Sequence, residues 1–190
     1  MRNPLLVFLF AYIMCNAYGQ DKWVKGTYYD LKGEKHKGLI SRQKSTLSFI
    51  KFKSNDESAI SKLSSTNIKC FTAGLDSFTV SHAPNLQQYP FLRVVINWTL
   101  KMYVSRQTMV SLPSKSVPRY QYISDLYYYG SNPDNLTEMK STNFLDAMDK
   151  ILTTKPELFK KIKLKEYTFN DMEEIVIDYN APITEKPKAD

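Results

Sequence analysis

Short stretches in which apolar and polar residues alternate fill the chain from about residue 22 to residue 140. The clearest is 100–106, where Leu100, Met102 and Val104 occupy every second position. A period of two predicts a β-strand that turns one face toward a hydrophobic core. The other predicted strands are 23–31, 35–42, 46–53, 67–72, 77–82, 91–96, 120–129 and 136–140.

Turn-forming residues separate these strands and predict tight connections. In the turn 32–34, Gly33 is expected to adopt a positive φ between two hairpin strands. The segments 73–76 and 131–134, which contain Gly74 and Pro133, predict two more turns of this kind. The alternation slips within 46–53, which predicts either a bulge or a strand buried on both faces. The polar segment 54–65 is predicted to be a loop.

The hydrophobic period changes from strand to helix after Lys140. Ser141 or Thr142 is expected to cap the first helix, and Pro156 to begin the second. Asn170 and Glu173 have the spacing of a capping box that would open a third helix. The apolar stripes of these helices are Phe144, Leu145, Met148, Ile151 and Leu152, then Leu158, Phe159 and Ile162, and then Met172, Ile175, Val176 and Tyr179.

Strands followed by a short helical region predict an α+β fold. We expect six to nine antiparallel strands in a meandering sheet or partly open barrel, because the connections are too short for parallel crossovers. Two or three short helices would form a C-terminal cap. The predicted organisation is a single domain over 20–180, β-rich over 22–140 and helical over 141–180, with a disordered tail over 181–190.

The N-terminal residues have the pattern of a secretory signal peptide. Arg2 is the only charged residue before Asp21, an apolar run covers 5–14, and small residues lead to Gly19. The run is too short to cross a bilayer, which takes about 20 apolar residues. We therefore expect cleavage after residue 19, export to the periplasm, cell surface or medium, and no transmembrane segment in the mature protein.

Charge and cysteine content change this picture little. The formal net charge of +7 is scattered along the sequence. It favours an anionic surface or glycan as partner, but solubility is a sufficient explanation for it. Cys15 lies within the expected signal peptide, so Cys70 would be alone in the mature chain, with no internal disulfide. Cys70 is interpreted as a small buried hydrophobic residue in a strand.

Three features of the sequence carry a family resemblance. The first, near the N-terminus, consists of Lys25-Gly26-Thr27-Tyr28-Tyr29, Leu31-Lys32-Gly33-Glu34 and Lys37-Gly38-Leu39-Ile40. The second is a pair of predicted strands, Phe91-Leu92-Arg93-Val94 and Leu100-Lys101-Met102-Tyr103. The third, near the C-terminus, consists of Lys155-Pro156-Glu157-Leu158, Tyr167-Thr168-Phe169-Asn170-Asp171 and Ile175-Val176-Ile177-Asp178-Tyr179-Asn180. With them the chain resembles a group of uncharacterised exported proteins of Bacteroidota. The resemblance implies the envelope of a Gram-negative bacterium, and it implies no activity and no catalytic residues.

Residues suited to catalysis or metal binding are few. Neither His36 nor His82 belongs to an H-E-x-x-H motif, and no G-x-S-x-G is present. We expect His36 to be exposed beside its turn and His82 to be packed at a strand end. The acidic pairs 56–57 and 173–174 suit a loop and a helix start better than glycoside hydrolysis. Two histidines and one cysteine supply little for a metal, so neither a metal nor a cofactor is predicted.

A tyrosine-rich strand is the most suggestive candidate for binding. Tyr127 and Tyr129 share one face, while Tyr128 points to the other face with Tyr120 and Tyr122. One set is expected to line the core, and the other either packs at an edge or stacks on a sugar or peptide. The candidate binding residues are Tyr127, Tyr128, Tyr129 and Trp98.

The sequence favours a non-enzymatic protein of the cell envelope that binds another protein or a surface glycan. Two alternatives stay open. One is a hydrolase whose active site is dispersed along the sequence. The other is a lipid or membrane-surface binder, suggested by the lysines 160, 161, 163 and 165, although these fit the solvated face of a helix. Nucleic acid is not expected as a partner of an exported protein, and the oligomeric state is left open.

Overall fold

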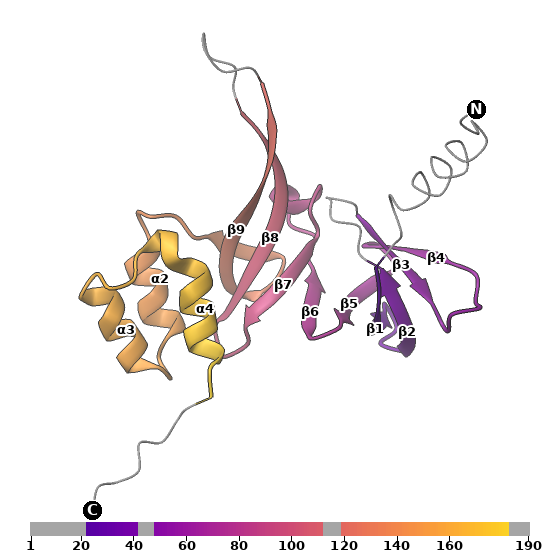
Figure 1. The fold of residues 1–190 in the computed structure, drawn as a ribbon, viewed down its shortest axis with the longest axis horizontal. Coiled ribbons are helices and arrows are strands. Elements are labelled where there is room, and N and C mark those ends of the chain that lie inside the picture. Colours follow the sequence, from indigo (N-terminus) through magenta and orange to yellow (C-terminus); the bar gives the residue numbers. More distant parts are fainter. Residues whose placement is uncertain (1–21, 42–47, 112–118, 183–190) are drawn as a thin grey trace, which may run out of the picture.

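The computed structural model describes residues 22–41, 48–111 and 119–182. Within them, the chain forms one sheet of antiparallel strands followed by three α-helices (Figure 1). The strands are β1 (Trp23–Asp30), β2 (Lys35–Ser41), β3 (Phe49–Lys53), β4 (Ser61–Ser64), β5 (Ile68–Ala73), β6 (Asp76–Val80), β7 (Phe91–Ile96), β8 (Lys101–Val110), β9 (Gln121–Asn132) and β10 (Asn135–Glu138). The α-helices are α2 (Phe144–Ile151), α3 (Pro156–Lys163) and α4 (Met172–Asn180), and the 3₁₀ turns are η1 (Pro84–Leu86) and η2 (Phe169–Asp171).

The sheet is a meander with one rearrangement. Its order is β10-β9-β8-β7-β6-β5-β1-β2-β3-β4, so every neighbouring pair is consecutive in the chain except β5 and β1. The sheet is open, with β10 and β4 at its edges. The predicted α+β class with a helical cap is thereby confirmed. The strand number was underestimated, because the described residues form ten strands and β4 lies in the segment predicted to be a loop.

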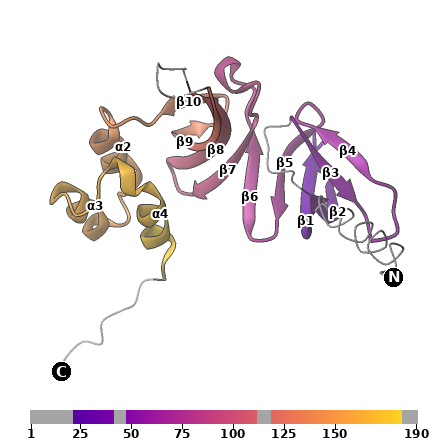
Figure 2. The same cartoon turned by 45° about the horizontal axis from the view of Figure 1, so that its top comes forward.

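The helices and the first strands lie at opposite ends of the molecule (Figure 2). Three groups of buried residues accordingly hold it together. The first lies within β1–β6 and contains Ile40, Ile50, Phe52, Ile68, Phe71, Phe78 and Val80. The second lies between the helices and β7–β8 and includes Ile96, Met102, Val104, Phe144, Met148, Ile151, Leu158, Ile162, Met172 and Ile175. The third contains Ala83, Leu86, Leu92, Tyr103 and Tyr128.

Strand β8 separates the second and third groups and is buried on both of its faces. Met102 and Val104 pack toward the helices, whereas Tyr103 belongs to the third group. Ser105 on that same side is fully buried. The alternation in 100–106 correctly indicated a strand, but the expectation of a single buried face was wrong because η1 and β10 bring apolar side chains to the other face as well.

The helix starts differ in part from the sequence predictions. Pro156 begins α3, as predicted. The residue before α2 is Asn143, whose side chain accepts the N–H of Lys140, so neither Ser141 nor Thr142 is the N-cap. The capping box lies two residues earlier than predicted, because the Thr168 and Asp171 side chains form it at η2. The expected pairing of Asn170 with Glu173 was therefore wrong.

Strands β8 and β9 continue past the rest of the sheet as a two-stranded arm (Figure 1). Their pairing extends to Val110 and Gln121, beyond the last β7 partner of β8. A bidentate pair on the arm joins Arg106 to Asp125, with both N···O distances at 2.8 Å. The expected signal peptide 1–19 and most of the expected tail, 183–190, lie outside the described residues.

A facing pair of glycines lets the first strands pack closely. Gly26 and Gly38 lie opposite each other in β1 and β2. A Cβ on Gly38 would overlap the carbonyl oxygen of Lys53 and lie 2.6 Å from the Phe52 ring, and one on Gly26 would overlap the carbonyl oxygen of Thr72. Cα atoms of β2 and β5 come within 8 Å of one another although β1 lies between them. Strands two apart in a flat sheet are separated by about 9.5 Å, so the sheet is strongly curled here.

We predict that Gly38→Ala lowers the free energy of unfolding by about 1–3 kcal/mol, the usual cost of an overpacked site. This loss would outweigh the stabilisation of about 0.5–1 kcal/mol that alanine normally brings to a strand interior. Gly74→Asn is the matched control, because Gly74 has φ +63 with open space around it and asparagine tolerates that conformation. Denaturant unfolding measures both. An unchanged or stabilised Gly38→Ala protein would contradict the close approach.

Candidate functional site

Most of the tyrosines considered in the sequence pack into or against the cores. Tyr127 and Tyr129 are half-buried against the group beneath the helices, and Tyr128 is 3% exposed. Burial raises the pKa of both Tyr127 and Tyr128. Tyr120 and Tyr122 are instead exposed on the arm, with their ring centroids 5.8 Å apart. The two faces of β9 thus both contribute to packing near the helices, and only the arm leaves tyrosines at the surface.

The other residues considered in the sequence do not assemble into a reactive site. Trp98 is exposed in the connection between β7 and β8. His82 is exposed, so the expectation that it packs at a strand end was wrong; its backbone N–H donates to Asp134. Cys70 is half-buried in β5, and burial raises the pKa of its thiol, which disfavours the nucleophilic thiolate. Lys161, in the solvated face of α3, pairs with Asp178 at 3.1 Å.

The registers of β1 to β4 instead bring a set of lysines to one face of the sheet. Lys25 lies level with Leu39 and Lys53 across β1, β2 and β3, and Lys51 lies opposite Lys62. Because side chains alternate between faces, residues joined by this register share a face. We call this surface the basic face, and its members are Lys25, Lys35, Lys37, Lys51, Lys53 and Lys62, with Trp23, Tyr29 and Phe49 among them.

Aromatic rings and ammonium groups are interleaved on the basic face. The Nζ atom of Lys53 lies 4.6 Å from the centroid of the Trp23 ring. Lys62 and Phe49 have a corresponding distance of 5.2 Å, and Lys35 and Tyr29 one of 5.9 Å. All three are within cation–π range, so the lysine side chains lie along the sheet surface. Lys35 and Lys62 are exposed, whereas the Lys53 side chain is 13% exposed and its ammonium group pairs with Asp56.

An open groove crosses the middle of the basic face, with a volume of about 600 Å³. Its lining is mixed: two ammonium groups, several hydroxyls, one side-chain amide and the backbone of the glycine pair surround it, together with apolar surface. Asp56 is the one carboxylate among the described lining residues, and it is 3.7 Å from Lys53. The lining consists of Lys25, Gly26, Thr27, Lys37, Gly38, Leu39, Ser54, Asn55, Asp56 and Thr72.

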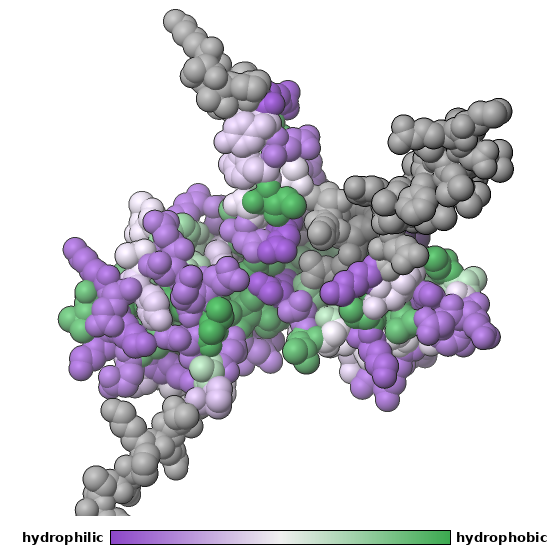
Figure 3. Space-filling model, in the orientation of Figure 1, coloured by the Kyte–Doolittle hydropathy of each residue, from purple (hydrophilic) through white to green (hydrophobic). Residues whose placement is uncertain are grey.

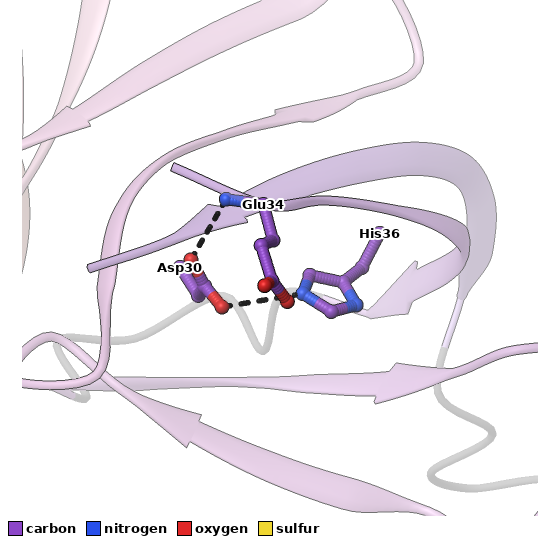
Figure 4. A group of neighbouring side chains, drawn as sticks. All are labelled: Asp30, Glu34 and His36. Atoms are coloured by element: carbon purple, nitrogen blue, oxygen red, sulfur yellow. Dashed lines mark hydrogen bonds and ion pairs between the residues drawn. The ribbon is translucent and has the colours of Figure 1, made fainter. Parts of the chain in front are cut away.

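A second polar group lies at the turn between β1 and β2, on the other face of the sheet. Asp30, Glu34 and His36 point toward one another there (Figure 4), with their ligand atoms all within 4.8 Å. The His36 ring stacks on Tyr28, with 4.5 Å between centroids and 12° between planes. The His36 side chain is 37% exposed beside the turn, and one side of its ring is covered by Tyr28. Within the described part of the chain, these are the residues suited to hold a metal ion.

Several donors converge on the Asp30 carboxylate. Oδ1 accepts the backbone N–H of Glu34 at 2.9 Å, and Oδ2 lies 3.5 Å from Nε2 of His36. Partial burial acts to raise the pKa of Asp30, but the backbone N–H groups of the turn and the His36 ring together outweigh it, so the pKa is lowered. The carboxylate is therefore ionised at neutral pH and holds the turn in place.

The sequence contains a local pattern for each of the two groups. The lysines of the basic face occur at alternate positions within strands, such as Lys35 with Lys37 and Lys51 with Lys53. The pattern Asp30-x₃-Glu34-x-His36 surrounds a predicted tight turn, and a tight turn brings such residues together. The sequence alone does not show that β1 pairs with both β2 and β5. These pairings decide which side chains of the three strands lie on the same face of the sheet.

No protein family, curated protein or solved structure matches the chain. The fold and the geometry of these two groups therefore carry the functional argument. No helix in the described residues is long and apolar enough to span a membrane. The molecular face in Figure 3 is largely hydrophilic, and its hydrophobic areas are small and separated.

We predict that Asp30→Asn lowers stability at neutral pH and that this effect vanishes in acid. Because the pKa is lower in the folded state, the stabilisation is complete above the ordinary value of 3.8 and is lost as the pH falls through the lower folded value. Unfolding of both proteins in the presence of a chelator, at pH values from about 7 to 3, measures this. Asp146→Asn, in the exposed face of α2, controls for removal of one charge. A difference that stays constant with pH would refute the role of the Asp30 carboxylate.

Proposed function

We propose that the protein is an exported, non-enzymatic module of the cell envelope that binds an anionic surface glycan through the basic face. The signal-peptide pattern of residues 1–19 and the resemblance to exported Bacteroidota proteins support the location. The observation that carries the binding role is the convergence of lysines from β1, β2, β3 and β4 on one face, to which the described strands contribute no carboxylate.

The arrangement of charge favours an extended anionic ligand. A solvated lysine surface normally carries acidic side chains of opposite sign among its lysines. Among the described residues, the carboxylate of Asp56 in the adjoining turn lies 3.7 Å from the ammonium group of Lys53 on the basic face. Repulsion among the lysines is relieved when a polyanion lies across the strands. The groove between Lys25 and Lys37 would hold one unit of such a polymer.

The chemistry of the groove favours a saccharide among anionic ligands. Thr27, Thr72 and Ser54 bring hydroxyl groups and Asn55 an amide, which suit the hydrogen-bonding groups of a sugar. Trp23 lies on the same face, and the side of its ring away from Lys53 would be the apolar surface for a sugar ring. Glycoside hydrolysis requires a second carboxylate across the bond, and the described lining holds Asp56 alone. Binding without cleavage fits these residues.

A different surface supports protein binding as a second candidate function. The arm exposes apolar side chains on both of its faces: Val110 and Ile123 on one, and Tyr120 and Tyr122 on the other. Ile123 is 59% exposed. Apolar side chains on a projecting two-stranded ribbon, which has few neighbours to stabilise it, are typical of a segment covered by a partner.

We predict that the double variant Lys25→Glu/Lys37→Glu weakens binding to polygalacturonate at least about tenfold, a loss of about 1.4 kcal/mol or more. The reason is that two attractive charges at the groove become repulsive. Lys160→Glu/Lys163→Glu changes the total charge equally on the exposed face of α3 and should leave the affinity nearly unchanged. Quantitative binding assays with neutral dextran as a second ligand measure the effect.

The salt dependence and a lipid control separate the possible outcomes. Binding should fall steeply as salt approaches about 1 M, where the screening length is about 3 Å. Equal loss in both double variants would show that only total charge matters. Binding to phosphatidylglycerol vesicles without binding to the polysaccharide would show that the ligand is a membrane surface and not a glycan.

The double variant Tyr122→Ser/Ile123→Ser, on the arm, should not alter polysaccharide binding, and its effect on capture of envelope proteins tests the second function.

A further inference from the structure

The turn between β1 and β2 presents three metal-ligating side chains on a rigid backbone. The N–H of Asp30 donates to the carbonyl of Glu34, and the N–H of Gly33 donates to the carbonyl of Asp30, both at 3.1 Å. Gly33 has the positive φ of 89° that was predicted for this turn. A bulge between Tyr29 and Asp30 interrupts the β1–β5 register at the same place. The backbone that carries the ligand groups is thus ordered before any ion arrives, which lowers the entropy cost of binding.

The position of each ligand atom fits a shared ion. Oδ1 of Asp30 is occupied by the N–H of Glu34, so Oδ2 is the oxygen that faces His36. Its distance of 3.5 Å from Nε2 is longer than the 2.7–2.9 Å of a charge-assisted hydrogen bond. Two ligands bonded to one tetrahedral ion at about 2.0–2.1 Å lie about 3.3–3.4 Å from each other. The Glu34 carboxylate completes the group within 4.8 Å (Figure 4).

The His36 ring is held in place from the side. Stacking on Tyr28 fixes the plane of the imidazole, and Tyr28 in turn meets Phe52 edge-on, with 4.9 Å between ring centroids. The orientation of the ligand is therefore anchored in the first core. Side-chain exposure is 37% for His36 and 25% for Asp30, so an ion from solution can reach the site and water can complete its coordination.

The ligand set selects among metal ions. Calcium and magnesium prefer six or more oxygen ligands, which this turn does not supply. An imidazole with two carboxylates suits zinc, and two carboxylates balance the charge of a divalent ion. We propose that Asp30, Glu34 and His36 form a zinc site that fastens the β1–β2 turn and leaves coordination positions open to solvent. The site lies on the opposite face from the groove and does not depend on the proposed glycan binding.

Calorimetric titration of the chelator-treated full chain with zinc chloride tests the proposal. One zinc ion should bind per chain, and Glu34→Gln or His36→Gln should weaken binding at least about tenfold, as loss of a ligand does. His82→Gln and Cys70→Ser are matched controls, because they remove the chain's other imidazole and a thiol that lies opposite Tyr29, on the other face of the sheet from His36. Both should bind zinc as the unaltered protein does. Glu34 is exposed, so its variant is expected to fold even if the His36 variant does not.

A second readout locates the ion directly. The chain has two histidines, whose ring signals NMR can distinguish. Zinc should shift the signals of His36 and leave those of His82 in place. The proposal is overturned if no saturable one-to-one binding occurs, if binding survives in both Glu34→Gln and His36→Gln, or if the His82 signals shift instead.

Discussion

The close approach of strands at the Gly26–Gly38 pair is the constraint on which the first half of the molecule depends. No other residue fits at Gly38 between the carbonyl of Lys53 and the ring of Phe52 without movement of the backbone. This approach curls the sheet, so one of its faces closes around the first core. The opposite face then carries the side chains that the core excludes, and the lysines of β1 to β4 are gathered there. The groove lies against the same two glycines. The first core and the basic face therefore lie on the two sides of the same curled sheet.

Much of the fold could be predicted because its signals are local. Hydrophobic alternation located most strands, Gly33 marked a turn with positive φ, and Pro156 marked a helix start. Strand β4 was missed because its four residues include a single large apolar side chain, Leu63, so no period is visible. The insertion of β1 beside β5 was also beyond prediction, since pairing between strands distant in the chain depends on the shape of the completed core.

The candidate sites were less predictable than the fold because each depends on those distant pairings. The lysines looked scattered in the sequence and come together only in the registers of four strands. His36 was interpreted as a solvated residue because stacking on Tyr28 is a cross-strand contact. The tyrosines of β9 attracted attention by their number, yet the strand passes between two cores, and burial accounts for Tyr127, Tyr128 and Tyr129. The number of tyrosines in β9 therefore indicated packing, whereas the basic face arises from the pairing of strands.

The most direct test of the glycan proposal is an NMR titration of the full chain with an acidic oligosaccharide of galacturonate. The account predicts that backbone amide shifts concentrate in β1, β2, β3 and the turn 54–56, with Lys25, Lys37 and Asn55 among the most perturbed. The shifts should saturate and should be reversed by added salt, because screening weakens attraction between the lysines and the ligand. Shifts centred on the β8–β9 arm or on the lysines of α3, with the groove unperturbed, would contradict the account.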